Sequence, residues 1–133
     1  MSLRRFHYTQ RRLPFVPLTL SYSGQSIQRD ALVDSGATNN VMPYQVGCDL
    51  GLSWDAQTLK LPEEEAFDGV PVVGIRVFGC IKPFPPIPLV FAWWKSDTRP
   101  LILGHMNFFM AFDVHFYDAA GFFELAPSPG RFF

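Results

Sequence analysis

Residues 32–40 read LVDSGATNN and place a carboxylate directly after an apolar stretch. Asp34 is followed by three small residues, Ser35, Gly36 and Ala37. An aspartate at the end of a strand often serves only as a turn former, because its side chain bonds to nearby backbone groups. The same arrangement is also what an active-site loop requires. The neighbouring segments decide between the two interpretations.

The segment before Asp34 predicts a β-hairpin that leads directly to the carboxylate. Residues 15–22, FVPLTLSY, alternate between apolar and polar side chains, and residues 23–25, SGQ, favour a turn. Residues 26–33 then return as the second strand. About 70 residues later, residues 101–103, LIL, form a second short apolar strand that ends at Gly104.

The remaining chain predicts short strands separated by turns. Twelve Pro and ten Gly residues argue against long helices. Further predicted elements are one or two helical turns at 43–50, a hairpin within 59–77, a Pro-rich connection at 79–86, a strand at 87–94, a short helix at 105–111, and strands at 112–116 and 122–125. We therefore predict a single all-β domain over residues 13–126, with an N-terminal segment at 1–12 and a C-terminal tail at 127–133.

The composition limits the classes of partner. The 133-residue chain is 48% hydrophobic and 16% aromatic but only 17% charged, which favours a compact domain that covers part of its surface with a partner. A formal net charge of −1 argues against binding to nucleic acid or to an anionic membrane surface. Neither the two cysteines nor the three histidines have metal-ligand spacing. We see no signal peptide or transmembrane run, and we expect a cytoplasmic protein.

Four segments in this order resemble the retropepsin-like aspartic proteases. They are the hairpin at 14–33, the loop DSGATNNVMP at 34–43, a mid-chain hairpin, and LILGHMNFF at 101–109 before the strand FDVHF at 112–116. The resemblance implies a closed barrel of the acid-protease fold with a flap hairpin. It also implies an aspartic endopeptidase that needs no cofactor and acts on a peptide or protein substrate.

The resemblance assigns roles to the residues of the loop. Peptide hydrolysis without a metal or a covalent intermediate needs a base that activates water and an acid that protonates the leaving amine. Two adjacent carboxylates that share one proton perform both tasks. Because the chain carries one DSG sequence, the resemblance implies a symmetric homodimer with one catalytic Asp34 from each subunit, cleaving extended apolar segments.

Other residues are expected to support this carboxylate. Ser35 would bond to the partner's loop, and Gly36 and Thr38 would line the active-site loop. Ala37 has no hydroxyl to donate to the carboxylate, so we predict a dyad that stays active toward mildly acidic or neutral pH. Leu103 and Gly104 would lie beneath the loop.

The flap and the dimer contact follow from the same resemblance. The predicted flap residues that line the cleft are Phe67, Asp68, Gly69, Val70, Pro71, Val72 and Val73. Many relatives have an arginine where this chain has His105, and residues 38–40 supply no carboxylate to pair with one. Dimerisation would then depend on the hairpin at 112–125 and on the apolar tail.

Two alternatives remain open from the sequence. The first is a catalytically silent retropepsin-fold module that serves in dimerisation or peptide binding. The second is an unrelated β-barrel binding domain in which the DSG sequence is accidental. For the tandem Trp93 and Trp94, alternation along a strand predicts one side chain in the core and one at an interface.

Overall fold

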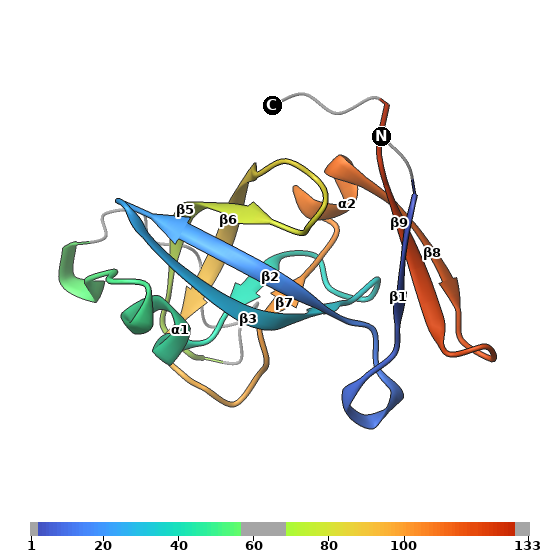
Figure 1. The fold of residues 1–133 in the computed structure, drawn as a ribbon. Helices are drawn as coiled ribbons and strands as arrows, with labels where there is room; N and C mark the ends of the chain where they lie inside the picture. Colours follow the sequence, from blue (N-terminus) through green and yellow to red (C-terminus); the bar gives the residue numbers. More distant parts are fainter. Residues whose placement is uncertain (1–2, 57–68, 130–133) are drawn as a thin grey trace.

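The computed structural model describes residues 3–56 and 69–129 (Figure 1). Its elements are β1 (Arg4–His7), η1 (Gln10–Arg12), β2 (Phe15–Tyr22), β3 (Gln25–Val33), β4 (Asn40–Met42), α1 (Tyr44–Asp49), η2 (Trp54–Ala56), β5 (Val72–Cys80), β6 (Ile87–Trp94), β7 (Ile102–Leu103), α2 (Phe108–Ala111), β8 (Phe112–Tyr117) and β9 (Phe122–Pro127). Short strands dominate and the helices are short, which confirms the predicted all-β class. Within the described residues, no helix has the length and apolar character needed to cross a membrane.

Six strands form a closed barrel in the order β2-β3-β7-β4-β6-β5. The predicted hairpin is β2 and β3, which pair antiparallel from Phe15↔Leu32 to Tyr22↔Gln25. Its turn places Ser23 and Gly24 at positive φ, where glycine is favoured. The barrel closes where β2 pairs with β5, and side chains that alternate inward fill it.

The C-terminal end of β3 is paired with a strand from the far end of the chain. β3 runs parallel to β7, with Leu32 opposite Ile102 and Val33 opposite Leu103. β7 in turn pairs with β4 through Val41 and Ile102. β7 therefore pairs with both strands that the loop between β3 and β4 connects. This loop begins at Asp34.

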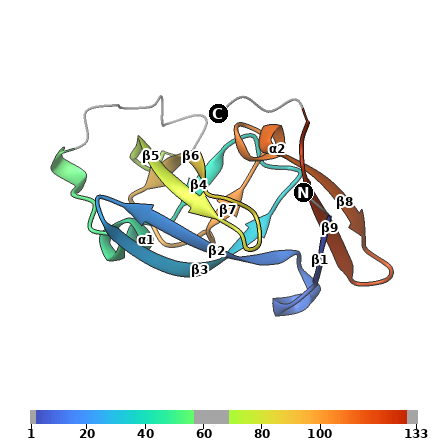
Figure 2. The same ribbon diagram turned by 45° about the horizontal axis from the view of Figure 1, so that its top comes forward.

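A separate three-stranded sheet with the order β1-β9-β8 stands at one side of the barrel (Figures 1 and 2). β8 and β9 are the predicted C-terminal hairpin. The N-terminal strand β1 pairs with β9, and the guanidinium of Arg5 donates to the carboxylate of Glu124 at 2.9 Å. The predicted boundary between residues 12 and 13 stays a prediction, but part of the N-terminal segment is in the sheet.

Two helical predictions differ in extent from the structure. Helix α1 occupies Tyr44–Asp49. The helix requires glycine at position 47, because a Cβ there would lie 2.2 Å from Cε2 of Trp93. The predicted helix at 105–111 is shorter, since α2 begins only at Phe108. The predicted connection at 79–86 also starts late, because β5 continues to Cys80 and pairs with β6 as far as Gly79↔Ile87.

The tandem tryptophans are both buried, and they face different clusters. Trp93 lies in the interior of the barrel. Trp94 packs in a second cluster with Val41, Val72, Ala92 and Ile102, and Ala37 of the Asp34 loop packs against this cluster. The two side chains therefore face different sides of β6 as predicted, whereas an interface role for Trp94 stays a prediction. The second cluster forms the apolar support of the loop.

Candidate active site

Asp34 lies at the end of β3, and its backbone continues the pairing with β7. Its N–H donates to the carbonyl of Leu103 at 3.0 Å. The chain then turns sharply, because the N–H of Ala37 donates to the carbonyl of Asp34 at 3.1 Å. Within this turn, the N–H of Gly36 donates to Oδ1 of Asp34 at 2.9 Å. The half-buried carboxylate thus has one oxygen held by its own loop.

Gly104 lies against the backbone of the same loop. A Cβ on Gly104 would be 2.6 Å from the carbonyl oxygen of Asn39 and 2.7 Å from that of Ala37. Real Cβ atoms do not approach backbone oxygens so closely, so this close packing requires glycine. The residues after Gly104 then bind the loop directly. The N–H groups of His105 and Met106 donate to the carbonyls of Ala37 and Thr38 at 2.9 and 2.7 Å.

Asn40 is a buried polar residue that joins three parts of the site. Its side chain is 1% exposed. Its Oδ1 accepts from the N–H of Gly104 at 2.8 Å, and its Nδ2 donates to the carbonyl of Val90 at 2.9 Å. Asn107 extends this network, because its Oδ1 accepts from the N–H of Val90 at 2.8 Å. Sequence reasoning noted Asn40 only for its lack of a carboxylate and missed this role.

His105 bonds to the exposed tip of the loop. Its Nε2 lies 2.6 Å from the carbonyl oxygen of Ser35, a group that only accepts, so the ring nitrogen is the donor. The ring also packs on Phe109, with the centroids 4.6 Å apart. The sequence indicated that His105 stands where relatives place an arginine, and the structure gives the histidine a bond within its own chain.

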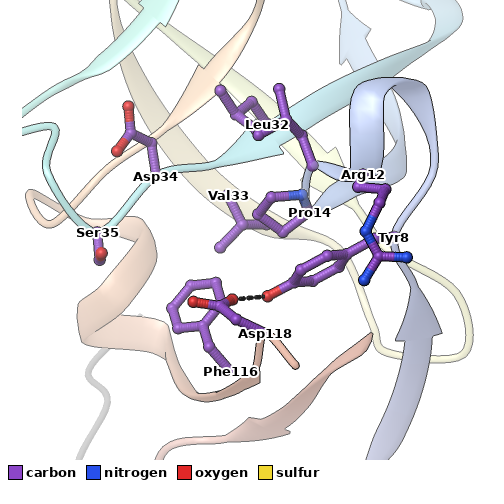
Figure 3. A pocket seen from close by; sticks show the side chains of 10 residues that line it. Tyr8, Arg12, Pro14, Leu32, Val33, Asp34, Ser35, Phe116 and Asp118 are labelled. Atoms are coloured by element: carbon purple, nitrogen blue, oxygen red, sulfur yellow. Dashed lines mark hydrogen bonds between the residues drawn. The ribbon is translucent and has the colours of Figure 1, made fainter. Parts of the chain in front are cut away.

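Two open pockets meet at Asp34. The first has a volume of about 550 Å³ and extends from Asp34 and Ser35 toward the three-stranded sheet (Figure 3). Apolar residues make up much of its wall, and they are Leu13, Pro14, Leu32, Val33 and Phe116. The hydroxyl of Tyr8 donates to Asp118 at the end away from Asp34. Burial, followed by this bond, raises the pKa of Tyr8 to about 12.

The second pocket, of about 380 Å³, lies on the other side of the loop. Its wall combines the loop with the second apolar cluster and consists of Asp34, Gly36, Ala37, Thr38, Asn39, Val41, Trp94, Arg99 and Ile102. The guanidinium of Arg99 lies over the Trp94 ring at 5.0 Å from its centroid. All five loop residues named from the sequence, 34–38, therefore line a pocket. Asp34 lines both, Ser35 lines the first, and residues 36–38 line the second.

The predicted flap residues are only partly within the described chain. Phe67 and Asp68 lie outside the described residues. Gly69 and Pro71 are exposed, and Val70 packs against the second apolar cluster together with Ala37. Val72 and Val73 are buried in β5 opposite Trp94 and Trp93. Val70 and Val72 therefore pack in the apolar cluster that supports the loop. The role of this segment in covering a substrate stays a prediction.

The described residues offer no cluster of three or more His, Cys, Asp or Glu side chains that could hold a metal ion. Asp118 is the other carboxylate in the wall of the first pocket, and it already accepts from Tyr8. Asp34 is the carboxylate that lines both pockets.

Comparison with solved structures identifies the architecture. A retropepsin-like aspartic protease from Rickettsia conorii superposes with a TM-score of 0.68 over 93% of this chain and 90% of that chain. The chain has a retropepsin-like fold. The two sequences are only 12% identical, so the likeness shows the retropepsin-like fold and leaves activity to be argued from the site. No protein-family model matches the sequence, and no curated protein sequence matches it either.

Proposed function

We propose that the protein is an aspartic endopeptidase that works as a symmetric homodimer with one Asp34 from each subunit. One observation carries the proposal: a half-buried carboxylate at the end of β3, held by the N–H of Gly36, opens into two pockets of a retropepsin-like fold. A turn-forming aspartate on the surface would not need a buried asparagine and a close-packed glycine behind its loop. Asn40 and Gly104 supply such support here.

The requirement for a second carboxylate supports the dimer. Cleavage by acid–base chemistry needs one ionised and one protonated group within reach of the same water molecule. Asp118 shares the first pocket but accepts from the Tyr8 hydroxyl, so it is a poor candidate for the second group. A two-fold axis beside Asp34 would bring the same carboxylate from another copy, and repulsion between the two would keep one proton shared.

The surroundings of Asp34 favour an extended substrate with apolar side chains. Gly36 is exposed and has no Cβ, so a peptide backbone could approach it closely. On either side, apolar groups such as Leu32 and Phe116 in one pocket and Trp94 and Ile102 in the other offer sites for side chains. The hydroxyl of exposed Ser35 lies at the tip of the loop, where it would reach a partner's loop.

Light scattering and an unbiased peptide library together test the proposal. The expected result is a dimer that cleaves peptides within apolar segments, with Asp34→Asn abolishing cleavage while the dimer persists. Asp30→Asn is the matched control, because Asp30 is an exposed aspartate on β3, the strand that leads to Asp34, and a new amide can still accept from Gln10. Its cleavage should equal that of the wild type.

Two outcomes would refute the proposed function. A strict monomer at high concentration excludes a dyad built from two copies. A dimer that cleaves nothing between about pH 3.5 and 7.5, a range that spans ordinary carboxyl and imidazole pKa values, supports the catalytically silent module instead.

A further inference from the structure

The loop at 34–39 is attached to the rest of the chain at its two ends by backbone bonds. At its start, Asp34 bonds to Leu103, and at its end, Ala37 and Thr38 accept from the N–H groups of residues 105 and 106. The exposed tip between these ends, Ser35 and Gly36, is not paired with a strand. Among the described residues, the group from outside the loop that bonds to this tip is the His105 ring.

The bond from His105 acts on the peptide group that also holds the catalytic carboxylate. The carbonyl of Ser35 and the N–H of Gly36 belong to one planar peptide unit and point in opposite directions. Nε2 of His105 donates to this carbonyl at 2.6 Å, and the N–H donates to Oδ1 of Asp34 at 2.9 Å. The imidazole, the peptide unit and the carboxylate therefore form a chain of two hydrogen bonds.

Such a chain does two things at once. It fixes the plane of the Ser35–Gly36 peptide, which determines where the Gly36 N–H points and hence how the carboxylate is oriented. It also polarises the peptide, because a donor on the carbonyl strengthens the opposite N–H as a donor. Packing of the imidazole on Phe109 keeps the ring nitrogen aimed at the carbonyl.

We propose that His105 is a positioning residue that orients the Asp34 carboxylate through the Ser35–Gly36 peptide, from within the same subunit. This inference rests on the proposed function as far as catalysis is concerned. The geometry of the bond chain does not depend on that function. The loop would thus be held in its working shape by its own chain, without an ion pair from the partner.

The first test uses nuclear magnetic resonance and needs no enzymatic activity. The Gly36 amide proton reports the strength of its bond to Asp34, because stronger hydrogen bonds move such protons downfield. We expect an upfield shift in His105→Ala and in His105→Phe, which keeps a ring on Phe109 but has no donor. In His105→Gln a side-chain N–H can reach the same carbonyl, so the shift should stay near the wild-type position. An unchanged Gly36 proton in both the Ala and Phe variants overturns the inference.

The second test follows cleavage of a library-derived peptide. His105→Ala and His105→Phe should lower kcat by about tenfold, the loss expected for one strong hydrogen bond, with KM changed by less than about twofold. His105→Gln should recover most of the activity, and His7→Ala, on strand β1 of the three-stranded sheet, should match the wild type. If kcat in all three His105 variants equals that of the wild type, the positioning role is overturned. If no variant and no wild type cleaves, the proposed function fails, and the Gly36 shift still decides the inference.

Discussion

Replacement of Asn40 by alanine removes the buried hydrogen bonds that join the end of the Asp34 loop to Gly104 and to β6. Asn40→Ala leaves the buried N–H of Gly104 without its acceptor, which is now at 2.8 Å, and the carbonyl of Val90 without its donor. A buried donor that loses its partner costs about 1–3 kcal/mol, and a small cavity adds to this cost. We expect the free energy of unfolding to fall by about 3 kcal/mol. For a domain of this size, that corresponds to a decrease in Tm of about 10 °C.

Urea denaturation followed by circular dichroism measures this change. Asn39→Ala is the matched control: the same substitution at the neighbouring, half-buried residue, whose side chain makes no hydrogen bond among the described residues. It should change the free energy by less than about 1 kcal/mol. Asn40→Asp tests the donor separately, because a carboxylate would still accept from Gly104 but would face the Val90 carbonyl. Equal stabilities of the Asn40→Ala and Asn39→Ala proteins would refute the proposed role of Asn40.

Two further predictions concern the helix and the sheet. Gly47→Ala places a Cβ 2.2 Å from the ring of Trp93, which is stacked on Tyr44. We expect the free energy of unfolding in urea to fall by about 3 kcal/mol and the tryptophan emission to change. A decrease below about 0.5 kcal/mol would contradict the packing. The pKa of Tyr8 is raised from 10.0 to about 12 by burial and by the bond to Asp118. Its contribution to stability is therefore complete below pH 10 and is lost as the pH rises toward 12, and Tyr8→Phe should show a smaller decline of unfolding free energy over this range.

The sequence predicts the part of the site that is contiguous along the chain. Alternating side chains in β2 and β3 predict the hairpin, and the hairpin leads to Asp34. The apolar run that ends at Gly104 predicts a strand. The resemblance to the retropepsin-like proteases, which rests on the order of the segments, places this strand near the loop. These features are local or rest on one short motif, so they can be derived without coordinates.

The rest of the site depends on contacts between distant segments. Asn40 is the polar first residue of β4, and only its burial against Gly104 and Val90 shows that it is structural. Tyr8 and Asp118 meet because β1 pairs with β9, a pairing that the charged sequence Arg4–Arg5 does not indicate. Glycine is unfavourable in a helix interior, yet Gly47 is the residue that lets α1 approach Trp93. Each of these three features depends on packing between segments that are far apart in the sequence.

The central claim is that one active site needs an Asp34 from each of two copies. Mixing wild-type protein with Asp34→Asn protein at constant total concentration, and allowing subunits to exchange, tests it directly. Mixed dimers would have a single ionisable carboxylate in the dyad and should be inactive. In an equal mixture we therefore predict about one quarter of the wild-type activity, because only that fraction of dimers has two wild-type subunits. Activity of about one half would mean that each subunit works alone, and it would contradict the account.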